Sequence, residues 1–154
     1  MILFLVVMVN YTDEDLLDHH AIGAVIRNSD GHVLMQNHVK LGFWTVPIGK
    51  AKPEQTPIEA LREEILEECN LIVDEFNEIS SERKDYSRND RLVNVMTHLY
   101  DVLSYSGEMK NNEPHKHTEQ KFLPIEEIKS LPYLSDATLA FLKSLGFERE
   151  SRLE

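Results

Sequence analysis

The sequence predicts an α/β or α+β sandwich in which a mixed sheet packs against helices. Short apolar segments rich in Val, Ile and Leu, which are typical of strands, are interleaved with two or three helical segments along the chain. The length of 154 residues suits a single domain. We divide it into an N-terminal extension over residues 1–18, which includes a possible strand, and a core over residues 19–145.

The N-terminal part is expected to form short strands and turns. Residues 2–9 are apolar throughout, which predicts a buried strand, an interface strand or an upstream extension. Residues 12–15 form an acidic linker. Residues 20–27 and 32–36 have the composition of strands, and the Asn-Ser-Asp-Gly segment at 28–31 is typical of a tight turn. We therefore expect a β-hairpin here.

The rest of the chain is expected to alternate strands and helices. The main helix should cover residues 56–69, because Thr56 can cap it and Pro57 suits its first turn. We expect Gly146 to end the last helix. Strands are predicted at 44–46, 71–79, 92–103 and 122–123, polar connections at 80–89 and 104–118, and further helices at 124–130 and 135–145.

The main predicted helix carries a cluster of carboxylates. Glu64, Glu67 and Glu68 fall within an arc of about 100° on a helix, because residues three and four apart are neighbours. Hard oxygen ligands in such a cluster suit Mg²⁺ or Mn²⁺ that bridges to substrate phosphates. A solvated acidic face is the alternative. A second arc has the spacing of a buried stripe, and its residues are Ile58, Leu61, Ile65 and Cys69.

Composition and charge exclude several classes of protein. The 27 acidic residues outnumber the 16 basic ones and give a net charge of −11, so we expect no nucleic-acid partner held by phosphate contacts alone. The single cysteine, Cys69, excludes an internal disulfide framework and fits a reducing, cytoplasmic compartment. Residues 2–9 are too short to span a bilayer and lack the features of a signal peptide, so no membrane association is expected.

Residues 49–71 resemble the signature of the Nudix hydrolases. That signature is Gly, five residues, Glu, seven residues, Arg-Glu, an aliphatic, any residue, Glu-Glu, any residue, Gly and an aliphatic. Anchored on Glu67 and Glu68, the chain keeps this spacing throughout. Three side chains differ, because Gln55 stands in place of Glu, Glu63 in place of Arg and Asn70 in place of Gly.

The resemblance continues on both sides of the signature. Residues 20–36 look like the opening hairpin of the family, and residues 43–47 look like its lead into the signature loop. Residues 113–117 and 122–128 look like the tail of the MutT-like, nucleotide-hydrolysing branch. The match over residues 19–142 implies a Nudix-like α/β/α sandwich with a mixed central sheet. Dimers are common among such proteins, so a homodimer is a further expectation.

The resemblance implies hydrolysis of a pyrophosphate bond in a nucleoside diphosphate that is linked to another group, with Mg²⁺ as cofactor and Mn²⁺ as a substitute. The implied metal ligands are Glu64, Glu67, Glu68 and the backbone carbonyl of Ile48. The candidates for catalytic carboxylates, one of which would act as the base, are Glu64, Glu67 and Glu113. The candidates for contacts with substrate phosphates are Lys50, Lys52 and Lys116.

The three departures from the signature differ in their expected effects. Asn70 tolerates the left-handed conformation expected after a helix, and the amide of Gln55 can still form hydrogen bonds. Glu63 is expected to add repulsion where the family arginine orients a metal-binding glutamate. Arg62 lies about 100° round the helix and is a poor replacement. We therefore expect weaker metal affinity or slower turnover.

Substrate choice stays open at this point. The MutT branch often has an arginine after the second hairpin strand, and residues 36–40 contain none. The Glu113-Pro114 tail favours a (deoxy)nucleoside triphosphate over a dinucleoside polyphosphate, ADP-ribose or an NDP-sugar. The alternative functions are a catalytically weak or inactive Nudix-fold module that binds a nucleotide, and an acidic interaction protein without a ligand.

Overall fold

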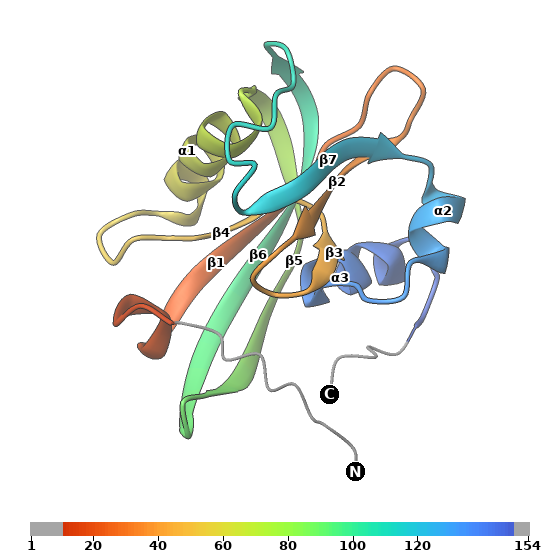
Figure 1. Ribbon diagram of the computed structural model, residues 1–154. Coiled ribbons are helices and arrows are strands. Elements are labelled where there is room, and N and C mark those ends of the chain that lie inside the picture. Colours follow the sequence, from red (N-terminus) through yellow and green to blue (C-terminus); the bar gives the residue numbers. More distant parts are fainter. Residues whose placement is uncertain (1–10, 150–154) are drawn as a thin grey trace.

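Within residues 11–149, which the computed structural model describes, the strands form two sheets (Figure 1). The larger sheet has the order β4-β1-β6-β5 and is mixed, because β1 runs parallel to β6 and antiparallel to β4. The smaller sheet, β3-β2-β7, is antiparallel. The strands are β1 His19–Val25, β2 Val33–His38, β3 Phe43–Thr45, β4 Ile48–Lys50, β5 Ile72–Arg88, β6 Arg91–Ser106 and β7 His117–Leu123. The strand expected at residues 2–9 lies outside the described residues.

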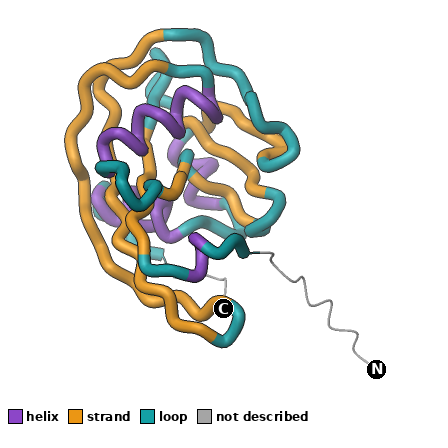
Figure 2. Tube along the Cα trace, turned by 90° about the vertical axis from the view of Figure 1, so that its left-hand side faces the viewer, coloured by secondary structure: helices purple, strands orange, loops and turns teal. Residues whose placement is uncertain are grey.

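Helices cover both faces of the larger sheet. Helix α1 (Pro57–Cys69) packs on one face, and α3 (Asp136–Ser144) packs on the other, with the short α2 (Ile125–Ser130) and the 3-10 turn η1 (Glu14–Leu16) at the periphery (Figure 1). In Figure 2 the long strands curve along one side of the molecule, and the helices lie beside them. The predicted sandwich with a mixed sheet is confirmed, whereas the second sheet was not predicted. None of the helices in the described part is long and apolar enough to cross a membrane.

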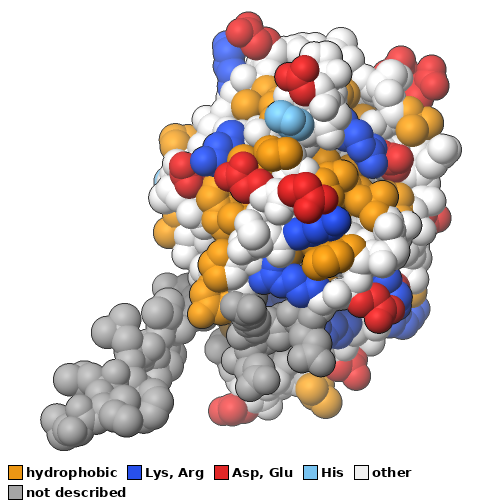
Figure 3. Space-filling view, turned by 90° about the vertical axis from the view of Figure 1, so that its right-hand side faces the viewer, with side chains coloured by type: hydrophobic (Ala, Val, Ile, Leu, Met, Phe, Trp, Pro, Cys, Tyr) orange, Lys and Arg blue, Asp and Glu red, His pale blue; other side chains and the backbone are white. Residues whose placement is uncertain are grey.

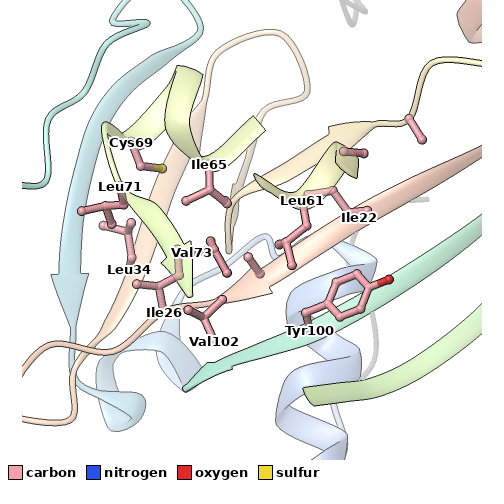
Figure 4. Close-up of a cluster of buried hydrophobic side chains, with 13 residues drawn as sticks. Ile22, Ile26, Leu34, Leu61, Ile65, Cys69, Leu71, Val73, Tyr100 and Val102 are labelled. Carbon is pink, nitrogen blue, oxygen red and sulfur yellow. The ribbon is translucent and has the colours of Figure 1, made fainter. Parts of the chain in front are cut away.

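Successive side chains of β1 point to opposite faces of the sheet and belong to two different hydrophobic cores. Ile22 and Ala24 point toward α1, and Val25 points toward the side of α3, because successive residues of a strand face opposite sides of a sheet. Figure 4 shows the core beneath α1, where Leu61 and Ile65 are fully buried. This packing fixes the face that α1 turns to the sheet.

The boundaries of α1 follow from its caps. Thr56 accepts a hydrogen bond from the backbone N–H of Glu59, whose side chain returns one to Thr56, so a capping box closes the N-terminus. Asn70 ends the helix with φ 62° and ψ 29°, the predicted left-handed conformation. The predicted buried stripe was wrong at Ile58, which is 43% exposed. Glu68 is buried instead, because the helix turns this flank toward the smaller sheet.

The strand β5, with 17 residues, is nearly twice as long as the strand expected at 71–79. It continues to Arg88 through the predicted polar connection at 80–89 and pairs with β6 along its whole length. Its outer half is an edge strand of polar residues, which lacks the apolar alternation that identifies a strand. The overlooked signal was Asn89-Asp90, whose positive φ values of 50° and 60° form the tight turn to β6.

Two further expectations near the N-terminus were wrong. The strands β1 and β2 meet only at the bridge between Arg27 and Val33, because β4 and β6 already occupy both edges of β1. The two strands therefore belong to different sheets and do not form the predicted hairpin. The short strand β4 (Ile48–Lys50) was also overlooked, because the strand predicted in this region ended at residue 46. This strand carries part of the candidate site.

Candidate active site

The site begins where β4 crosses α1. A side chain at Gly49 would place its Cβ 2.4 Å from Cγ and 2.8 Å from Oε2 of Glu64, so only glycine allows the strand to approach the helix this closely. Ile48, one residue earlier, lies in extended backbone, and its conformation suits an L-residue. The structure thus brings Ile48 and Glu64 into one small region.

Of the carboxylates of α1, Glu68 is buried and Glu64 is half-buried. Glu68 is 3% exposed, and its Oε2 has no hydrogen-bond partner. Burial, followed by the charges of Glu64 and Glu113, raises the pKa of Glu68 to about 8. Burial, followed by the charge of Glu67, raises the pKa of Glu64 to about 7. The negative charges of the cluster therefore repel one another.

A loop at residues 107–116 brings Glu113 to the same cluster. The backbone N–H groups of Lys110 and Asn112 donate to the carbonyls of Cys69 and Glu68 at 3.0 and 3.1 Å, so the loop caps the last turn of α1. Lys116 Nζ lies 2.9 Å from Glu113 Oε2. The charge of Lys116 lowers the pKa of both Glu64 and Glu68, which places this lysine beside the acidic cluster.

The donor set fits a hard divalent cation in its chemistry. Carboxylate oxygens are the ligands that Mg²⁺ prefers, and the buried, unpaired Oε2 of Glu68 is a donor that awaits a positive partner. Among residues 11–149, however, no group of three or more His, Cys, Asp or Glu side chains could hold a metal ion as they stand. Glu64, Glu67 and Glu68 would hold Mg²⁺ only if their side chains adopted a different arrangement.

The expected repulsion from Glu63 is present, because its charge contributes to the raised pKa of Glu64, but Glu63 also has two partners of its own. Glu63 Oε1 lies 2.6 Å from Lys52 Nζ, and Glu63 Oε2 accepts a hydrogen bond from Gln55 Nε2 at 2.6 Å. Arg62 points elsewhere, since it donates to the carbonyls of Val73 and Asp74. It does not replace the arginine of the signature.

The three candidate lysines have different surroundings. Lys50 Nζ lies 2.8 Å from Asp15 Oδ1 and 3.6 Å from Glu14 Oε2, so it fastens β4 to η1. Lys52 is held by Glu63, whereas Lys116 lies at the acidic cluster. Of the three, only Lys116 is placed by the structure beside both Glu64 and Glu68.

Sequence reasoning overlooked two buried polar residues near the cluster. Gln36 of β2 donates to Gln120 Oε1 at 2.8 Å and has an unpaired Oε1. His117 of β7 is 1% exposed, its Nδ1 has no partner, and its ring centroid lies 5.3 Å from that of His38. Gln36 is followed in β2 by the polar Asn37 and His38, so the composition of the strand gave no signal for its burial.

We expect His117 to make the protein less stable in acid. Burial, followed by the charge of His38, lowers the pKa of His117 to about 4, against about 6.5 in the unfolded chain. Between these values the unfolded state binds more protons, so the free energy of unfolding decreases as pH falls. At about 1.4 kcal/mol per pH unit, the loss attributable to His117 reaches about 3 kcal/mol at pH 4.

Urea unfolding of wild type and His117→Gln between pH 7 and pH 4 measures this effect. The difference between the two stability curves isolates the histidine, because the raised pKa values of Glu64 and Glu68 act with the opposite sign in both proteins. Parallel curves over this range would contradict the prediction.

The NUDIX domain model matches residues 17–144. The chain belongs to the NUDIX family. The prediction of a Nudix-type hydrolase is thereby confirmed at the level of the family, and the signature region at 49–71 lies inside the matched residues. Comparison with curated proteins gives no match.

Solved structures share the fold. The MutT NUDIX hydrolase from Burkholderia pseudomallei has 23% identity and a TM-score of 0.67, with 83% of this chain and 98% of that chain covered. A MutT protein from Methanosarcina mazei Go1 has 18% identity and a TM-score of 0.70, with 84% and 94% covered. The NUDIX domain of Shewanella oneidensis NrtR, complexed with ADP ribose, has 14% identity and a TM-score of 0.66, with 89% and 92% covered.

Proposed function

We propose that the protein hydrolyses a pyrophosphate bond in a nucleoside diphosphate linked to another group, that it depends on Mg²⁺, and that a (deoxy)nucleoside triphosphate is its preferred substrate. The observation that carries this proposal is the unpaired Oε2 of Glu68, which is 3% exposed and lies in a carboxylate cluster whose negative charge Lys116 balances only in part. Buried charges of one sign are costly, and a divalent cation with a phosphorylated substrate would complete the site.

The protein contributes a proton acceptor and contacts that position the phosphate groups. When bound, Mg²⁺ supplies positive charge to the phosphate oxygens and makes the attacking water more acidic. Glu64, Glu67 and Glu113 are the candidates that accept the proton of this water at a carboxylate oxygen. The oxygen of the water bonds to phosphorus, the bridging P–O bond breaks, and the leaving phosphate departs. Lys116 would contact a phosphate oxygen next to the cluster.

A nucleotide panel tests the activity and the substrate class together. Nucleoside and deoxynucleoside triphosphates, a dinucleoside polyphosphate, ADP-ribose and an NDP-sugar are assayed with Mg²⁺, with Mn²⁺ and with a chelator. ADP-ribose and a dinucleoside tetraphosphate belong in the panel because similar structures are described as an ADP-ribose complex and an Ap4A hydrolase. Metal-dependent release of nucleoside monophosphate is expected.

We expect Glu67→Gln to reduce turnover at least 100-fold while leaving the fold intact, because Glu67 lies exposed on the open side of the cluster. Steady-state kinetics, together with circular dichroism, measure both parts of this prediction. Full activity in Glu67→Gln would contradict the assigned role of the helix.

A nucleotide-binding module without turnover is the second candidate function. Gln55 and Glu63 differ from the signature, and the charge of Glu63 acts on the candidate ligand Glu64, which favours this alternative. Binding of a nucleotide by calorimetry, with no product under any metal condition, would establish it. Product formation at any metal concentration would exclude it.

A further inference from the structure

Three side chains fasten the loop after β4 to α1. Lys52 Nζ and Gln55 Nε2 approach the two carboxylate oxygens of Glu63, each at 2.6 Å. Gln55 Oε1 in turn accepts a hydrogen bond from the backbone N–H of Lys52 at 3.1 Å, and the N–H of Gln55 donates to the Lys52 carbonyl at 2.9 Å. Each oxygen of Glu63 thus has its own donor, and both donors come from one closed turn. We name Lys52, Gln55 and Glu63 the loop clamp.

We propose that the loop clamp positions the metal-binding groups, an inference that rests on the proposed function. The candidate ligands come from two elements, since Ile48 is in β4 and the glutamates are on α1. The contact between Gly49 and Glu64 is one attachment between these elements. The loop clamp is a second attachment three residues farther along the chain, and two attachments fix the spacing where one would allow a hinge.

The residue types in the loop clamp are complementary to one another. Glu63 is an acceptor only, so it needs donors on both oxygens. Gln55 supplies an amide N–H where a glutamate would place a second carboxylate against Glu63, and Lys52 supplies the charge. The two departures from the signature, at 55 and 63, therefore compensate for each other. Changing either one alone toward the signature would break the link.

The effect of the loop clamp is expected to be local. The side chains of Lys52 and Glu63 are 55% and 33% exposed, and exposed ion pairs contribute little to global stability. Mutation of a group that supports metal ligands nevertheless typically weakens metal affinity by about 10–100-fold. Loss of the clamp should therefore change metal affinity and loop exchange while the thermal midpoint of the metal-free protein changes little.

Charge reversal tests the proposal with two readouts. The variants are Lys52→Glu, Glu63→Lys and the double exchange. Hydrogen exchange reports on the backbone amides of residues 52 and 55. A thermal-shift titration gives the half-effect concentration, which is the Mg²⁺ concentration that produces half of the maximal rise in the thermal midpoint. Each single variant is expected to speed exchange of these amides and to raise the half-effect concentration by about 10-fold or more. The double exchange restores the ion pair and should recover most of both losses.

Conservative and matched variants separate position from charge. Lys52→Arg keeps a donor for Glu63 and is expected to behave like wild type in both readouts. Gln55→Glu alone and Glu63→Arg alone are each expected to speed amide exchange and raise the Mg²⁺ half-effect concentration. The double variant is expected to recover both readouts. Glu126→Lys on α2 changes net charge as much as Glu63→Lys does, but it lies on the other side of the molecule from α1 (Figure 1). It should leave both readouts unchanged.

The two proposals fail in different ways. A wild-type protein without any Mg²⁺ response overturns the proposed function. If hydrogen exchange at residues 52 and 55 is the same in the single variants as in wild type, the loop clamp is overturned. It is also overturned if the wild type responds to Mg²⁺ and the single variants have the same half-effect concentration as the wild type. Failure of the double exchange to recover either readout also overturns it, because the pairing itself would then be irrelevant.

Discussion

Replacing Glu68 by Gln is expected to abolish turnover and, at the same time, to stabilise the metal-free protein. The side chain is 3% exposed with an unpaired Oε2, so an ionised carboxylate there is a cost that a neutral amide of the same shape avoids. We expect a gain of about 1–3 kcal/mol in the free energy of unfolding at pH 9. Turnover should fall by at least about 100-fold, because a metal-binding charge is lost.

Urea unfolding with a chelator, and kinetics with Mg²⁺, measure the two effects. Because the pKa of Glu68 is raised to about 8, wild type carries the proton below this pH, and the stability gain of the variant should shrink as pH falls from 9 to 6. Glu119→Gln on β7 controls for the loss of one negative charge and should leave turnover unchanged. A Glu68→Gln variant that is less stable at pH 9, or fully active, would contradict the prediction.

Gly49→Ala is expected to reduce turnover by about 10–100-fold through displacement of Glu64. The added Cβ would lie 2.4 Å from Glu64 Cγ, a separation that real structures do not tolerate, so the glutamate or the strand must move. The backbone at Gly49 has no positive φ, so the effect comes from contact and not from backbone strain. Kinetics and the Mg²⁺-induced thermal shift measure it.

Gly31→Ala is the matched control for this change. Gly31 has φ +76° with nothing within 4 Å of the added atom, so its variant suffers backbone strain without a steric contact. It should lower the thermal midpoint without changing turnover per folded molecule. Equal losses of turnover in the two variants would show that general destabilisation, and not Glu64, is responsible.

The sequence predicted most accurately those features that depend on residues close together in the chain. The helix α1 has its cap, its proline and its left-handed Asn70 within a short stretch, and all three lie as expected. Burial along the helix was harder to predict, because the neighbouring sheet decides it. Ile58 is exposed and Glu68 is buried as a result.

Features that depend on the path of a loop could not be predicted from spacing. Glu63 is paired with Lys52, which lies eleven positions earlier in the chain, and no periodicity relates the two residues. The polar half of β5 was overlooked for a related reason, since its strand conformation comes from pairing with β6. The side chains there face solvent or form ion pairs such as Lys84–Asp136. Figure 3 shows acidic and basic side chains interspersed over the face on the side of α2 and α3.

The attachment of residues 107–116 to the end of α1 restricts the movement of this loop. Lys110 and Asn112 satisfy carbonyl groups of the final helical turn, and an atom added at Gly107 would lie 2.8 Å from the carbonyl oxygen of Asn70. Outward swinging of this segment would strip the helix end of its donors and loosen the turn that holds Glu68. Under the proposed function, this loop is therefore expected to stay fixed while larger nucleotides are accommodated by movement of other segments.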